Sequence, residues 1–130
     1  MNGNRELALS WFKTADEDIL AAEHEIRYED AVLRVICFHC QQAVEKYLKG
    51  YLIFHNKEFP FNHNISLLRK KLDEYKLEID FSDCSPDFMT VYASEARYPD
   101  PESIITEKDA KYSLQIAYEV RSRILEKVNI

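Results

Sequence analysis

The sequence predicts an all-α fold, an up-and-down four-helix bundle with an additional short helix. Three observations predict this class. Apolar residues recur at helical spacing over most of the chain, strand-like alternation is confined to one short segment, and only 2 Gly and 4 Pro occur among 130 residues. Because a chain of this length buries about two thirds of its unfolded surface, we expect one helical domain spanning residues 1–130.

The first predicted helix runs from about Asn4 to Tyr28. Its apolar positions alternate in steps of four and three, as in the seam of a helical bundle. They are Ala8, Phe12, Ala15, Ile19, Ala22 and Ile26. A short turn from Tyr28 to Asp30 then predicts antiparallel packing of this helix on the next one.

The second predicted helix, from Asp30 to His55, is the element around which the others are arranged. Asp30 is expected to cap it. Its broad apolar arc comprises Leu33, Ile36, Cys40, Ala43, Val44, Tyr47, Tyr51 and Phe54. Phe38, Leu52 and Ile53 make the far side partly apolar as well. A helix that is apolar on more than one side is central in its domain or shared with a partner subunit.

A third helix is predicted from Ile65 to Tyr75, capped by Asn62 or Asn64. Its basic triplet of Arg69, Lys70 and Lys71 is interpreted as a solvated face. Leu77, Ile79 and Phe81 then alternate with polar residues. Because a single strand has no partner here, we interpret residues 76–84 as an extended connector.

Two further helix starts follow. Ser85 as a cap with Pro86 in the first turn predicts a helix that ends near Tyr98, before Pro99. Thr106 followed three residues later by Asp109 resembles a capping box, and it predicts a last helix to about Val128.

Composition limits the classes of function. The net charge of −6 excludes a basic surface over the whole molecule, so any contact with nucleic acid must come from a local cluster. An odd number of cysteines and no apolar leader predict free thiols in a cytoplasmic protein. No apolar run is long enough to cross a bilayer, so we expect no membrane contact.

Cys37 and Cys40, with His39 between them, have the spacing of a metal or redox motif. A zinc site needs about four ligands, and no second pair is present in the sequence. A redox CxxC would belong to a βαβ pattern, which this chain lacks. We therefore interpret both cysteines as small buried hydrophobic residues and expect neither a metal nor another cofactor.

A polar stripe follows the central helix at His39, Gln42, Lys46 and Lys49, with spacing i, i+3, i+7 and i+10. One interpretation is a hydrated or interface face of the helix. The other is a polar groove in which Lys46 and Lys49 meet phosphate while His39 or Gln42 donates a hydrogen bond.

Arg97 and Tyr98 stand at the end of the fourth predicted helix, between Glu95 and two prolines. Arg suits bidentate phosphate contact and Tyr suits stacking on a base. The alternative is a structural salt bridge from Arg97 to Glu95 or to a carboxylate of the first helix. No Ser-His-Asp order, Gly-rich phosphate loop or HExxH motif is present to favour a common hydrolase or kinase.

The chain resembles the HEPN domain family over almost its whole length. The resemblance is carried by Trp11-Phe12 with Ala15 and Asp18, by the block from Cys37 to Lys49, by His63, and by Ala96-Arg97-Tyr98-Pro99. It implies a helical bundle that forms a homodimer and binds a nucleotide or RNA. It also implies a minimal nucleotidyltransferase as partner protein, as in toxin-antitoxin pairs of the family's small members.

Other members of that family are metal-independent ribonucleases that use an Arg followed within a few residues by a His. This sequence departs from that pattern, because no His follows Arg97 and the last histidine is His63. His39 and His63 are the remaining candidates for the proton donor.

We therefore expect a phosphate-binding module first and a ribonuclease centred on Arg97 second. The expected binding residues are Gln42, Lys46, Lys49, Arg97 and Tyr98. A protein-interaction scaffold without a ligand is the third alternative.

Overall fold

The structure is a computed structural model that describes residues 2–59, 62–81, 84–90 and 104–129. Four α-helices and one 3-10 helix occur in these ranges, without a strand, which confirms the predicted all-α class. The elements are α1 (Asn2–Ile26), α2 (Leu33–Phe54), α3 (Ile65–Glu74), η1 (Pro86–Met89) and α5 (Glu107–Val128).

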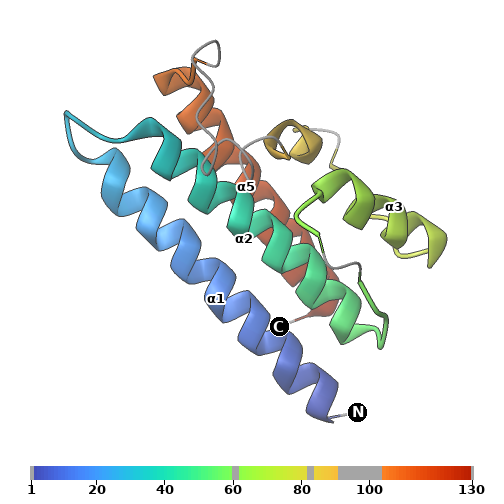
Figure 1. The fold of residues 1–130 in the computed structure, drawn as a ribbon. Coiled ribbons are helices and arrows are strands. Elements are labelled where there is room, and N and C mark those ends of the chain that lie inside the picture. Colours follow the sequence, from blue (N-terminus) through green and yellow to red (C-terminus); the bar gives the residue numbers. More distant parts are fainter. Residues whose placement is uncertain (1, 60–61, 82–83, 91–103, 130) are drawn as a thin grey trace.

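Helix α2 lies at the centre of the bundle (Figure 1). It runs antiparallel to α1, as predicted, while α3 lies on its other side and α5 packs behind it in the same direction. Its side chains are buried on nearly every face, including Ile36, Val44, Leu48 and Leu52. Leu52 therefore packs inside the bundle, whereas Phe38 and Ile53 are only partly buried.

The predicted seam of α1 is confirmed, because its positions from Ala8 to Ala22 are buried against the core and Ile26 packs at the edge. The predicted cap at Asp30 is wrong. The turn after α1 is longer than expected, so Val32 occupies the N-cap position and its side chain makes no capping bond. The Val32 N–H instead donates to Glu25 Oε1 of α1 at 3.0 Å.

Two other predicted helix starts are confirmed by their hydrogen bonds. Asn64 accepts from the Leu67 N–H at 3.2 Å. Thr106 and Asp109 form a reciprocal capping box, in which each side chain accepts from the other's backbone N–H. The side chains thus satisfy amide groups that a helix leaves unpaired at its first turn.

The helix predicted from Ser85 differs from the structure. Its described part is the 3-10 helix η1, and Ser85 makes no side-chain cap although Pro86 stands in the first turn as expected. The Ser85 N–H donates to the Tyr112 hydroxyl of α5 at 3.1 Å. The remainder of that prediction, to Tyr98, lies outside the described residues.

The alternating segment before η1 is an extended connector, as predicted. Ile79 and Phe81 are buried and Leu77 packs partly against the core, yet residues 77–81 pair with no strand. Alternation here therefore reflects burial of every second side chain beneath an extended chain.

Polar contacts join α1 to α5 on the side away from α3. The Tyr118 hydroxyl donates to Glu23, and Arg121 pairs with Asp16 at 2.9 Å. Partial burial, and then the hydrogen bond to the Glu23 carboxylate, raise the pKa of Tyr118 to about 12.

Candidate functional site

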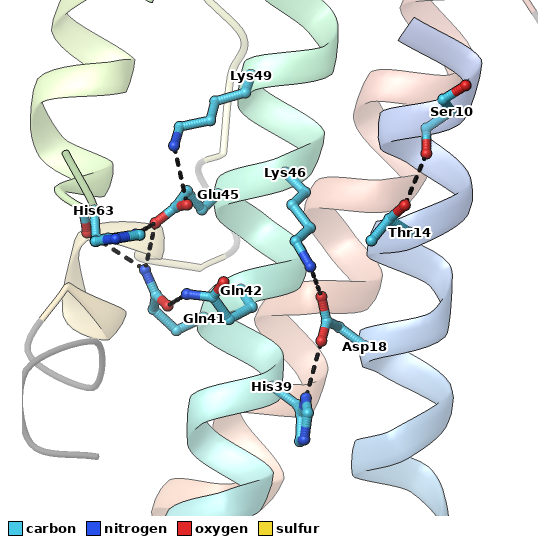
Figure 2. Close-up of polar contacts among 10 residues, drawn as sticks. All are labelled: Ser10, Thr14, Asp18, His39, Gln41, Gln42, Glu45, Lys46, Lys49 and His63. Atoms are coloured by element: carbon cyan, nitrogen blue, oxygen red, sulfur yellow. Dashed lines mark hydrogen bonds and ion pairs between the residues drawn. The ribbon is translucent and has the colours of Figure 1, made fainter. Parts of the chain in front are cut away.

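The predicted polar stripe of α2 faces the side of the bundle between α1 and α3, and the structure divides it into two clusters (Figure 2). His39 and Lys46 turn toward α1. Lys49 turns toward the chain that leads into α3. Gln42 lies between the two groups and donates from Nε2 to Gln41 Oε1 at 2.7 Å.

The first group, the Asp18 cluster, consists of Asp18, His39 and Lys46. His39 Nδ1 lies 2.9 Å from Asp18 Oδ1, and Lys46 Nζ lies 2.6 Å from Asp18 Oδ2. Both carboxylate oxygens are therefore used. Lys46 retains 21% of its side-chain exposure and His39 retains 31%, so both remain accessible from solvent.

The second group, the Glu45 cluster, consists of Gln41, Glu45, Lys49 and His63. The Glu45 carboxylate accepts from Gln41 Nε2 at 3.1 Å and from Lys49 Nζ at 3.1 Å, and it lies 2.9 Å from His63 Nδ1. Glu45 is 3% exposed. A buried carboxylate is tolerated when charged and hydrogen-bonding partners surround it in this way.

Lys49 belongs to the interior of this cluster. It is 6% exposed, and its ammonium lies 5.1 Å from the ring centre of Phe59 and 6.0 Å from that of Trp11. Its positive charge is thus balanced by Glu45 and covered by aromatic rings. Of the two lysines predicted to meet phosphate, Lys46 is the one that solvent reaches more readily.

His39 and His63 share a geometry that the sequence did not reveal. Each ring faces a carboxylate through Nδ1, and since a carboxylate only accepts hydrogen bonds, Nδ1 carries the proton. In the neutral ring, Nε2 is then the nitrogen that carries the lone pair. Their side-chain exposures of 31% and 45% make both imidazoles accessible to a ligand.

Gly50 allows α1 to approach α2 beside these clusters. A Cβ at position 50 would lie 2.7 Å from Phe12 Cε1 and 3.0 Å from Trp11 Cβ, closer than side chains tolerate. Because Gly50 has no side chain, Trp11 and Phe12 can pack directly against α2, next to Lys46 and Lys49.

Arg97 and Tyr98 lie outside the residues that the structure describes. Their predicted roles in phosphate contact and base stacking, and the predicted ribonuclease role of Arg97, stay predictions.

Cys37 and Cys40 are buried, as the sequence analysis predicted. Burial, and secondly the neighbouring Cys37, hold the pKa of Cys40 far above its usual range, so Cys40 stays a neutral thiol. Cys37 Sγ accepts from Ser113 Oγ of α5 at 3.6 Å. Within the described ranges, no three His, Cys, Asp or Glu side chains gather as metal ligands would.

Sequence reasoning missed the residues that complete the site from α1. Asp18 shares a helix face with Trp11 and Thr14, at steps of three and four, and this spacing was the available signal. A groove of about 260 Å³ between α1 and α2 was also missed; it is lined by Leu7, Ser10, Trp11, Thr14 and Lys46.

The fold and the site define an all-helical protein whose central helix carries two polar clusters beside a groove lined by Trp11. A family model described as the HEPN domain matches residues 8–128 of the chain. The chain therefore belongs to the HEPN domain family, which confirms the resemblance seen in the sequence. Comparisons with curated proteins and with solved structures found no match. None of the described helices combines the length and hydropathy of a membrane span.

Proposed function

We propose that this chain binds a nucleotide, or the phosphate backbone of RNA, at the partly buried strip of α2 formed by His39, Gln42 and Lys46, here called the α2 strip. Membership of the HEPN family supports a helical module related to nucleotides or RNA. The strip supplies hydrogen-bond donors that an anion requires, and its Lys46 also lines the groove that contains Trp11.

The observation that carries this proposal is the spare donor capacity of Gln42 and Lys46. Counting contacts among the described residues, Gln42 uses one of its two amide N–H groups on Gln41, and Lys46 uses one of three ammonium protons on Asp18. The two residues are one turn apart, so their side chains are neighbours on the helix. Figure 2 shows Gln42 turned toward Gln41 and Lys46 toward Asp18, so one phosphate group would accept from both after Gln42 rotates away from Gln41.

Asp18 sets a limit on the strength of this site. Its carboxylate already neutralises Lys46 in the free protein, so an incoming phosphate shares the ammonium instead of meeting an unpaired charge. We therefore expect moderate affinity, with Gln42 orienting the phosphate and Lys46 attracting it.

Thermal unfolding in the presence of millimolar AMP and GMP tests the proposal. A ligand that binds only the folded state stabilises it by about 2.7 kcal/mol at a concentration of 100 Kd, so the Tm should rise. The Lys46→Gln variant should lose the rise, whereas Lys70→Gln, an exposed lysine of α3, should keep it. No rise in the natural chain with either nucleotide would refute the proposal.

We also propose that the chain forms a homodimer. Helix α2 still exposes part of Phe38, and Val35 is 39% exposed one turn earlier, which leaves an apolar patch beside the α2 strip. Sedimentation equilibrium should give twice the 15.4 kDa mass of the chain. A concentration-independent monomer, or a Phe38→Glu variant that sediments like the natural chain, would refute this arrangement.

The partner protein of this proposal is a minimal nucleotidyltransferase, in a toxin-antitoxin type of pair. Its support is the family membership alone. Purification of the tagged chain from its native host should recover a stoichiometric nucleotidyltransferase. Recovery of the chain without such a partner under gentle conditions would contradict the pairing.

A metal-independent ribonuclease is the second candidate function, and the two carboxylate-bound histidines favour it. A carboxylate at Nδ1 orients an imidazole so that Nε2 can exchange a proton with a substrate. Labelled RNA should then be cut in chelator, and His39→Ala, His63→Ala or Arg97→Ala should remove the activity, whereas His24→Ala in the exposed end of α1 should not. Absence of cutting by the natural chain would remove this candidate.

A further inference from the structure

The groove between α1 and α2 differs from the rest of the site because its walls are largely apolar. Leu7 and Trp11 supply the apolar surface, and Lys46 brings a positive charge to the same groove. Its volume of about 260 Å³ is slightly below the roughly 300–1,000 Å³ of pockets that hold drug-sized ligands. It therefore has room for one compact apolar group attached to an anion.

Trp11 is held firmly on the side away from the groove. Its ring meets Phe59 edge to face, with centroids 5.5 Å apart and planes at 81°. The Lys49 ammonium lies 6.0 Å from its centroid, and Gly50 brings its Cβ close to the backbone of α2. An indole fixed in this way loses little conformational entropy when a ligand packs against it.

The hydroxyl groups of the groove restrict the chemistry of its occupant. Ser10 Oγ donates to the Glu6 carbonyl at 3.2 Å, and Thr14 Oγ1 donates to the Ser10 carbonyl at 3.0 Å. Figure 2 shows the pair one turn apart on α1, with Lys46 reaching toward the same helix. Since both hydroxyl protons are used within the helix, the oxygens offer acceptor lone pairs to a ligand.

We propose that this groove holds the base of a purine nucleotide against Trp11, while the phosphate of the same nucleotide meets Lys46. The inference rests on the proposed function and adds to it the recognition of a base. A purine is flat and apolar on its faces and carries N–H donors at its edge, which match the indole and the two hydroxyl oxygens. Lys46 lines the same groove, and the phosphate would share its ammonium with Asp18.

The test uses the natural reporter in the groove, because Trp11 is the only tryptophan of the chain. The full chain is titrated with AMP and with ribose 5-phosphate, which shares the phosphate and sugar but lacks the base. AMP should quench Trp11 fluorescence and bind roughly ten-fold more tightly than ribose 5-phosphate, as expected for one stacked base. Ribose 5-phosphate should bind without quenching.

Variants of Trp11 separate stacking from support of the fold. By calorimetric titration, Trp11→Leu should bind AMP no more tightly than ribose 5-phosphate. Trp11→Tyr keeps an aromatic face and should restore most of the preference for AMP. A Leu variant that keeps the full preference, or a Tyr variant that melts like the natural chain but lacks the preference, would overturn the inference.

The results of these titrations also distinguish base stacking on Trp11 from the proposed phosphate binding. Equal affinity for AMP and ribose 5-phosphate, without quenching, would refute base stacking and leave phosphate binding intact. Failure of both ligands to bind would refute both proposals. A shift of Trp11 emission with protein concentration, before any ligand is added, would show that a second copy of the chain fills the groove, and it would likewise overturn the inference.

Discussion

Glu45 organises more of the polar contacts on α2 than any residue singled out from the sequence. It joins His63 and Gln41 to Lys49, whose ammonium is enclosed beneath Trp11 and Phe59. The cluster is costly to desolvate, and its stability depends on every partner being present. Changes at Glu45 should therefore affect folding before they affect any ligand.

We expect Glu45→Gln to destabilise the protein by roughly 3 kcal/mol, because it leaves the buried Lys49 ammonium without its counter-charge. The urea midpoint of unfolding measures this loss. Glu74→Gln, which breaks the exposed pair with Lys71, is the matched control and should hardly move the midpoint.

The double variant Glu45→Gln with Lys49→Met distinguishes loss of the counter-charge from loss of shape. It should recover part of the stability, since no unpaired charge then remains buried. Equal midpoints for Glu45→Gln and Glu74→Gln would contradict the structural role given to Glu45.

At this scale the sequence predicted the polar residues of α2 but not their partners. Periodicity places His39, Lys46 and Lys49 on one helix, and it contains no information on which neighbouring helix supplies Asp18 or which loop supplies His63. The split of the stripe into two clusters follows from tertiary packing. The same limit applies to the groove at Trp11, because its lining residues come from both α1 and α2.

The elements were predicted best where local chemistry decides the outcome. The seam on α1, the cap at Asn64 and the capping box at Thr106 depend on side chains within one helix and were confirmed. The predicted cap at Asp30 was wrong, and Ser85 stands at the predicted helix start without a side-chain cap. At both places the observed hydrogen bond comes from another helix, which local sequence does not specify. Glu25 takes the Val32 N–H, and Tyr112 takes the Ser85 N–H.

The turn that follows helix α3 contains a residue that is poorly suited to its backbone conformation. Lys76 has a φ of 59°, and the next residue, Leu77, closes the helix by donating its N–H to the Leu72 carbonyl at 2.8 Å. Glycine normally occupies such a position, since a side chain there costs roughly 1–2 kcal/mol. The helix end therefore carries a small, removable strain.

We expect Lys76→Gly to stabilise the protein by roughly 0.5–1 kcal/mol, because relief of that strain exceeds the added entropy of the unfolded chain. Lys70→Gly, the same substitution inside α3, should instead cost about 1 kcal/mol. Urea unfolding of both variants checks the prediction through the opposite signs of their shifts. Shifts of the same sign would show that Lys76 is unstrained in solution.

For the whole molecule, the distribution of charge decides how much nucleic acid the chain can hold. The net charge is −6, and many of the basic groups on the described surface face carboxylates. Such pairs include Arg69 with Asp87, Lys71 with Glu74, Arg121 with Asp16, Arg123 with Glu119, and Lys46 with Asp18. Such a surface does not attract a polyanion along its length.

The salt dependence of binding should therefore stay shallow. A single phosphate contact at Lys46 predicts a slope of about −0.7 for log K against log salt on a single strand, compared with several times that value for an extended basic surface. Fluorescence anisotropy with a labelled dinucleotide and with a single-stranded RNA of roughly 20 nucleotides, between roughly 50 and 200 mM salt, measures both slopes. We expect the two ligands to give the same slope. The Lys46→Gln variant should bind neither ligand with a measurable dependence on salt. A slope several times steeper for the longer RNA would mean that the protein binds many phosphates at once. RNA would then be the ligand of this surface in place of a single nucleotide.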